Sequence, residues 1–260
     1  MERLRDRDDK SGGLNRNTIR AWGLVFLALG IVGRSVLQNR LLGIGTVSTE
    51  ELLAVMQASQ SSMLIATVAL ALQALETCAI PVFAVLLLEG FQYTSDLKNY
   101  LLRVAGLAVL SELPYNLAMS GKLLDLSSRN PVFGLVLGLI LLYYYQRYEE
   151  KSFQNFLIKV LVAVAAVLWT GMLRIDYGAC LVLVVCALWI FRGNTLARNL
   201  AGATVTVVCS LSSPFFLAAP MGFLLIHFYN GERDVDNRLV NYLAYPVMLL
   251  LIGVVALVIG

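Results

Sequence analysis

Charged residues are scarce in this chain. Only 14% of its 260 residues are charged, against about 25% in ordinary soluble domains. Hydrophobic residues make up 58%, and the mean hydropathy is +0.75. This composition excludes an ordinary soluble domain and indicates a protein whose main partner is the lipid bilayer. No nucleic-acid partner is expected.

Histidine is nearly absent, and cysteine shows no ligand spacing. The chain has one His and 17 acidic residues spread over its length, which leaves little room for a metal cluster. The four cysteines lie inside apolar runs without a C-x-x-C motif, at Cys78, Cys180, Cys186 and Cys209. They are typical of small buried hydrophobes, so we expect no metal, zinc site or disulfide framework.

The chain also lacks a cleavage site after its first apolar run, an internal repeat and a low-complexity segment. Residues 1–20 are polar and rich in Arg, so we interpret them as a retained cytoplasmic basic tail and not as a signal peptide. Residues 21–260 are then a single transmembrane helical domain. The expected location is the plasma (inner) membrane of a prokaryote.

Apolar runs predict about nine membrane spans. They cover residues 21–38, 62–88, 98–118, 131–146, 156–173, 178–191, 197–212, 214–229 and 239–259. Several are shorter than the roughly 20 residues that a perpendicular helix needs, which favours tilted or broken helices. Residues 46–60 carry a capping box, Ser48 or Thr49 with Glu51, and are expected to form a short interfacial helix.

The distribution of Lys and Arg tests this count. With nine spans and the N-terminus inside, fifteen of the 20 basic residues fall on the cytoplasmic side and four outside, with Arg34 in the first span. The positive-inside rule therefore supports an all-α, polytopic transmembrane helix bundle with its N-terminus in and C-terminus out.

Small residues mark the faces where helices approach closely. Gly134 and Gly138 form a G-x-x-x-G motif in the fourth span. Gly23 and Gly30 share one face of the first span with Arg34, so we expect Arg34 to face the protein interior.

Several polar residues lie within or beside apolar sequence. A charge in hydrocarbon costs from a few to roughly ten or more kcal/mol, so such residues are functional candidates. Toward the outer side we place Arg34, Glu112, Asn116, Arg174 and Asp176; toward the cytoplasmic side, Glu89, Thr94, Arg103 and His227; and near the middle, Glu76. Two polar vestibules of this kind suit a protein that takes a donor from the cytosol and an acceptor from outside.

Each candidate also has a structural interpretation. Arg34 and Glu112 form a buried ion pair in one reading, and we predict that they approach within salt-bridge distance. In the structural interpretation of Glu89 and Arg103, their side chains simply extend to the membrane interface and have no role in a site. Glu76 is hardest to explain as structure, because its neighbours in sequence offer no partner.

The remaining polar residues favour structural roles. Arg174 and Asp176 stand at a span end, which is typical of interfacial structure. His227 lies between two apolar residues near the cytoplasmic boundary, where a satisfied histidine is more common than a catalyst.

A run of motifs in order resembles the TraX family of integral membrane proteins. The matching residues are Ile80-Pro81-Val82-Phe83, Glu89-Gly90-Phe91 followed by Thr94, Tyr100-Leu101-Leu102-Arg103 and Ser111-Glu112-Leu113-Pro114-Tyr115. Weaker matches are Asn130, Asp176-Tyr177-Gly178, Tyr229-Asn230-Gly231 and Tyr242-x-x-Tyr245-Pro246. The resemblance covers most of the chain from Glu76 onward.

The resemblance implies an acyltransferase. The namesake of the family acetylates the amino terminus of a conjugative pilin subunit. For this chain it implies acetyl-CoA as donor and a pilin-like protein or a cell-envelope glycan as the acceptor that carries the amine or hydroxyl. Glu89, Thr94 and Arg103 would bind the cofactor, and Arg34, Asn116, Arg174 and Asp176 would form a polar cluster for substrate or structure.

Two family histidines are missing. Family members usually have Asp-His in the first span, where this chain has Gly33-Arg34, and His after the last Tyr-Pro, where it has Met248. Arginine cannot serve as a general base because it stays protonated. If catalysis persists, the base is Glu76 or Glu112, and Glu76 is the more deeply placed. The alternative is a catalytically degenerate scaffold or binding subunit, while a transporter is disfavoured because no inverted halves are apparent.

Overall fold

The structure is a computed structural model that describes residues 13–44, 54, 56–57, 59–232 and 238–259. Within these ranges every regular element is helical, and two isolated β-bridges are the only extended pairings. The helices are α1 (Arg16–Val32), η2 (Gly33–Leu41), α3 (Gln60–Glu76), α4 (Ala79–Tyr93), α5 (Leu97–Ser120), α6 (Val132–Arg147), α7 (Phe153–Met172), α8 (Gly178–Ile190), α9 (Thr195–Cys209), η3 (Pro214–Leu217), α10 (Pro220–His227) and α11 (Arg238–Ile259). The all-α fold predicted from the sequence is confirmed.

Each of the nine predicted spans falls on helix. Four helical stretches in the described ranges are long and apolar enough to cross a membrane: Arg16–Leu41, Gln60–Tyr93, Phe153–Met172 and Val240–Ile259. Shorter apolar helices are Val132–Arg147, Gly178–Ile190 and Pro214–His227. The count of nine spans and the sidedness of the two ends stay predictions. The expected interfacial helix at 46–60 lies largely outside the described residues.

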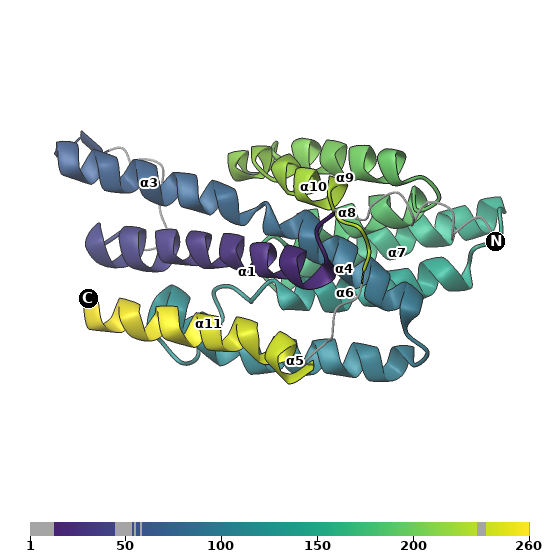
Figure 1. Ribbon diagram of the computed structural model, residues 1–260, viewed down its shortest axis with the longest axis horizontal. Coiled ribbons are helices and arrows are strands. Elements are labelled where there is room, and N and C mark those ends of the chain that lie inside the picture. The colour runs from purple at the N-terminus through teal and green to yellow at the C-terminus, as the bar shows by residue number, and fades with distance from the viewer. Residues whose placement is uncertain (1–12, 45–53, 55, 58, 233–237, 260) are drawn as a thin grey trace.

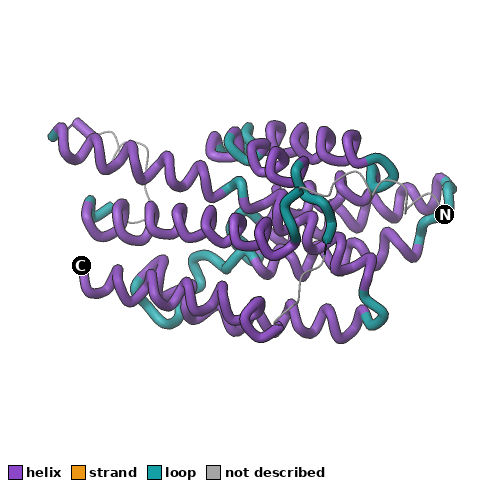
Figure 2. Tube along the Cα trace, viewed as in Figure 1, coloured by secondary structure: helices purple, strands orange, loops and turns teal. Residues whose placement is uncertain are grey.

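Helix α8 forms the centre of the bundle (Figures 1 and 2). Ten of its thirteen residues are buried, and it packs against α4, α6, α7 and α9. Helix α7 lies at the periphery, since only Ala166 and Thr170 are buried along its 20 residues. Helices α1, α3 and α11 lie lengthwise at the end of the molecule that carries the C-terminus (Figure 1), and α11 packs along α5. Helix α7, with only two buried residues and an apolar surface, is suited to contact lipid.

Glycines allow the close approaches that the sequence predicts. A Cβ on Gly134 would lie 2.9 Å from the Leu181 side chain, and one on Gly138 would lie 3.2 Å from Leu87. On α1, a Cβ on Gly30 would overlap the side chain of Glu76. The glycine-lined face of the first span is therefore the interior face, as expected.

Two helix irregularities occur at the level of the polar residues. The end of the first helix widens into the π-helix η2, which contains Arg34. Helices α3 and α4 are separated by a turn at Thr77 and Cys78, where the Ile80 amide bonds to the Thr77 carbonyl at 3.1 Å. Pro81 has no N–H to continue the α-helical ladder here. Irregular helices of this type often occur at functional sites.

A short clasp joins the start of the described chain to the link between α10 and α11. Leu14 and Tyr229 form a parallel bridge. The Leu14 amide bonds to the Phe228 carbonyl at 2.7 Å, and the Asn230 amide bonds to the Leu14 carbonyl at 3.0 Å. The start of α1 is thus fixed against the residues that follow α10.

Candidate functional site

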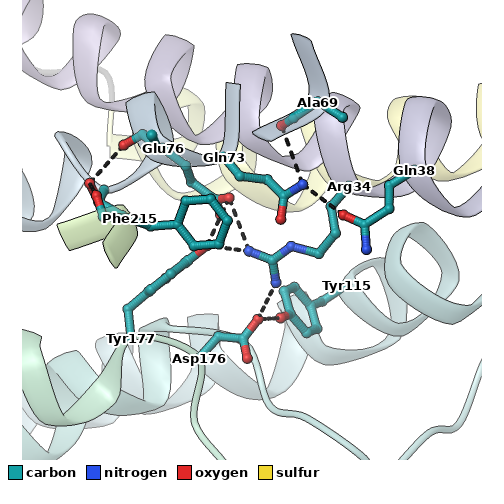
Figure 3. Close-up of polar contacts among 11 residues, drawn as sticks. Arg34, Gln38, Ala69, Gln73, Glu76, Tyr115, Asp176, Tyr177 and Phe215 are labelled. Carbon is teal, nitrogen blue, oxygen red and sulfur yellow. Dashed lines mark hydrogen bonds and ion pairs between the residues drawn. The ribbon is translucent and has the colours of Figure 1, made fainter. Parts of the chain in front are cut away.

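Arg34 is the centre of a buried ionic network (Figure 3). Its Nη1 donates to Asp176 Oδ2 at 2.7 Å, and its Nη2 donates to Glu76 Oε2 at 3.1 Å. The Glu76 side chain is only 3% exposed. One guanidinium therefore bridges two carboxylates that belong to α3 and to the link between α7 and α8.

Two tyrosines complete this network. The Tyr177 hydroxyl donates to Glu76 Oε2 at 3.0 Å and accepts a hydrogen bond from Arg34. The Tyr115 hydroxyl donates to Asp176. The Arg34 guanidinium also lies 5.5 Å from the centre of the Tyr177 ring. Each carboxylate thus receives hydrogen bonds from Arg34 and from one phenol, which stabilises its charge in a buried position.

Local backbone conformation positions these groups. Gly30 on α1 leaves room for Glu76, so the last residue of α3 can reach Arg34 one turn farther along. Tyr177 has φ 57° and begins α8 from a left-handed conformation. This conformation is uncommon for a residue with a side chain and frequently occurs at functional sites. It brings Asp176 and Tyr177 to the same guanidinium.

Glu112 does not pair with Arg34, so that predicted pair is wrong. Instead Arg129 Nη1 donates to Glu112 Oε1 at 2.9 Å, and the Asn130 side chain and backbone amide donate to Oε2 at 2.6 and 3.3 Å. The physical reason is geometric: the turn after α3 brings Glu76 to Arg34, while the link after α5 brings Arg129 and Asn130 back to Glu112.

The two clusters are joined through the backbone. The Arg129 amide bonds to the Arg174 carbonyl at 2.8 Å, and the Asp176 amide bonds to the Arg129 carbonyl at 3.0 Å. The link before α6 and the link before α8 are therefore held together. Asp176 in one cluster and Arg129 in the other occupy fixed relative positions.

A cavity of about 590 Å³ leads to the cluster around Arg34 and Glu76. Its lining includes residues of α1, α4, α5, α6, α8 and α11. On α1 it passes from Arg16 and Arg20 to Leu24 and Leu27. On α4 it runs from Tyr93 and Gly90 to Ile80 and Ala79, beside Glu76 at the end of α3. At a helical rise of about 1.5 Å per residue, the 15 residues of α4 extend roughly 22 Å from the Glu76 end of the cavity to its mouth.

The cavity changes character along its length. Its mouth includes the exposed residues Asp96, Asn99 and Arg103. Its middle is apolar, with Ile80, Phe83, Leu87, Val104, Leu107 and Leu135. Its inner part includes Glu76, Tyr177 and Tyr245. A charged entrance, an apolar passage and a polar inner end suit a long ligand whose two ends are both polar.

The structure brings some of the predicted site residues to this cavity and separates others. Thr94 and Arg103 line its mouth, and Glu76 lines its inner end. Arg34 contacts Glu76, and Asp176 in turn contacts Arg34. The lining reaches from Arg103 to Glu76 and does not include Glu112 among the described residues.

The other predicted residues have separate neighbours. Glu89 accepts a hydrogen bond from the Tyr229 hydroxyl at 2.6 Å. Asn116 is buried. With its side-chain amide turned so that both groups are satisfied, its nitrogen donates to the Asp125 carbonyl and its oxygen accepts from the Asp125 amide, each at 3.3 Å. Arg174 and His227 are exposed.

Sequence reasoning gave no role to the tyrosines of the site. Tyr177 and Tyr245 fall in two of the weaker family-like motifs, and Tyr115 ends one of the stronger ones. Those motifs were the available signal. Arg16 and Arg20 at the mouth were counted only as cytoplasmic charges. Among the described residues, no group of three or more His, Cys, Asp and Glu is placed to hold a metal ion.

Long apolar helices packed around a central helix, with an internal ionic network beside a cavity, define a helical membrane protein with an internal cavity. The family model described as TraX protein matches residues 53–256. The chain belongs to the TraX protein family. No curated protein matches it, and no solved structure does.

Proposed function

We propose that this protein transfers an acetyl group from acetyl-CoA to an amine or hydroxyl of an extracytoplasmic acceptor. The observation that carries the proposal is the cavity, which connects a mouth containing Arg16, Arg20 and Arg103 to the buried carboxylate of Glu76. The guanidinium groups suit the phosphates of a nucleotide thioester. The apolar passage suits its narrow arm, and the thioester would then lie near Glu76.

In this proposal Glu76 is the general base. The acceptor N–H or O–H loses its proton to Glu76 as its nitrogen or oxygen attacks the thioester carbonyl carbon. A new C–N or C–O bond forms, the C–S bond breaks, and the proton ends on the departing thiol. Arg34 and Tyr177 hold the carboxylate in position through their contacts with Oε2. A pilin-like protein or a cell-envelope glycan is the proposed acceptor, and the prokaryotic plasma membrane is the proposed location.

The test follows release of free thiol from acetyl-CoA in the presence of a panel of amine and sugar acceptors. Glu76→Gln is expected to lower transfer by roughly 10²-fold or more, since general base catalysis typically contributes 10²–10⁴-fold. Glu112→Gln is the matched control, because Glu112 is also a buried carboxylate bonded to Arg but does not line the cavity. Robust transfer by Glu76→Gln, or equal losses in the two variants at equal folded amounts, would contradict the role of Glu76.

The second candidate function is a non-catalytic scaffold or binding subunit. It is favoured by the way Arg34 and Tyr177 both engage Glu76, as in a structural ion pair. In that case no acceptor stimulates thiol release from the wild type, and Glu76→Gln changes only stability.

A further inference from the structure

Tyr245 carries a buried hydroxyl without a hydrogen-bond partner among the described residues. The side chain belongs to α11, is 6% exposed, and lines the same cavity as Glu76 and Tyr177. A buried polar group that makes no hydrogen bond lowers the stability of the folded protein.

The other buried tyrosines of the bundle do not share this property. Tyr115 donates to Asp176, Tyr229 donates to Glu89, and Tyr145 donates to the Lys159 carbonyl at 3.2 Å. Tyr245 is therefore an exception at a particular place, namely the wall of the cavity in its inner part. An unpaired donor in such a place is explained when a bound ligand supplies the acceptor.

We infer that the Tyr245 hydroxyl donates a hydrogen bond to the carbonyl oxygen of an acyl thioester bound with its acyl group near Glu76. The inference rests on the proposed function, because it takes the thioester as the ligand of this cavity. A neutral phenol is suited to a carbonyl oxygen, which accepts hydrogen bonds but carries no full charge.

The same contact would assist the reaction. When the acceptor attacks the carbonyl carbon, the π electron pair moves onto the carbonyl oxygen, and a donor already aimed at that oxygen stabilises the developing negative charge. The pair returns as the C–S bond breaks. Tyr245 keeps its proton throughout, whereas Glu76 carries the proton from the acceptor to the departing sulfur.

The experiment compares acetyl-CoA with S-ethyl-CoA, which has a methylene in place of the carbonyl. Dissociation constants are measured for the wild type, Tyr245→Phe and Tyr242→Phe. Tyr242 is the matched control, because it lines the same cavity from the same helix, one turn closer to the N-terminal end of α11. The wild type and Tyr242→Phe are expected to bind acetyl-CoA about 3- to 10-fold more tightly than S-ethyl-CoA, and Tyr245→Phe is expected to bind both equally.

A second measurement is independent of ligand. Because the hydroxyl has no partner, unliganded Tyr245→Phe should melt at the wild-type temperature or above it. A lower melting temperature would show that the hydroxyl is structural and would overturn the inference.

The outcomes separate the two proposals. If wild type and Tyr245→Phe prefer acetyl-CoA to the same degree, the role of Tyr245 is overturned while thioester binding stands. If the wild type binds neither compound, the proposed function fails, and the inference about Tyr245 fails with it.

Discussion

The two buried arginine–carboxylate clusters use the same residue types in different ways. Glu112 receives its hydrogen bonds from Arg129 and Asn130, which are adjacent in the sequence and stand just before α6. Glu76 receives its bonds from Arg34 in η2 and Tyr177 at the start of α8. The Glu112 cluster is assembled from α5 and the link that follows it. The Glu76 cluster is assembled from η2, α3, α5 and the residues just before α8, which are far apart in sequence.

The difference lies in what each cluster borders. The Glu112 cluster fixes the entry to α6, since Asn130 also accepts a hydrogen bond from the Val132 amide at 3.1 Å. The Glu76 cluster borders the cavity. A buried ion pair is thus by itself no sign of a ligand site; the site is indicated by the ion pair together with access from the cavity.

The largest effect is expected when Arg34 is removed. Arg34→Met leaves two carboxylates, Glu76 and Asp176, without their shared cation, and breaking a buried pair in this way costs about 3–5 kcal/mol of unfolding free energy. Adding Glu76→Gln should restore part of this loss, because it removes one of the stranded charges. Denaturation of the purified protein in detergent measures both. If the double variant is no more stable than Arg34→Met, the network is not ionic in the way described.

A smaller effect is expected in the other cluster. Arg129→Met should cost about 1–3 kcal/mol, because Glu112 keeps both donors from Asn130. The same denaturation series checks this value, with Lys122→Met as a control for loss of an exposed charge in the same link. A loss equal to that of Arg34→Met would remove the distinction between the clusters.

The smallest effect is expected at Arg174, although it lies between the two clusters. Its side chain is exposed, and the structure uses its backbone carbonyl to bond the Arg129 amide. Arg174→Ala should therefore change the unfolding free energy by no more than about 0.5 kcal/mol. A loss above 2 kcal/mol in the same assay would indicate that the side chain joins the clusters.

The positions of the helices could be predicted closely from the sequence. Apolar run length placed all nine segments, and the glycines at 23 and 30 identified the interior face of the first helix. These features depend on local composition and periodicity, which a single sequence records directly. The sequence predicts one span over 62–88, and the structure divides it at Thr77 and Cys78, just before Pro81, which has no N–H for the helical ladder.

The partners of the buried charges could not be predicted in the same way. A glycine-lined face shows that Arg34 points inward but does not say which carboxylate lies at its level. That depends on where α3 ends and on the left-handed conformation at Tyr177, both of which are set by packing of distant elements. The pairing of Glu112 with Arg129 could not be predicted for a similar reason, because the course of the link after α5 determines where the Arg129 side chain lies.

The clasp between Leu14 and Tyr229 has a consequence for biosynthesis. Its two sides stand far apart in the chain, and the neighbouring contact between Gly13 and Asn230 spans 217 positions. A ribosome that adds about 5–20 residues per second needs roughly 10–40 s to cover that interval. During this time α1 must reside in the bilayer without the segment that fixes its first turn. Since α11 supplies Tyr242 and Tyr245 to the cavity and follows the clasp in the chain, the lining of the cavity is incomplete until α11 has been translated.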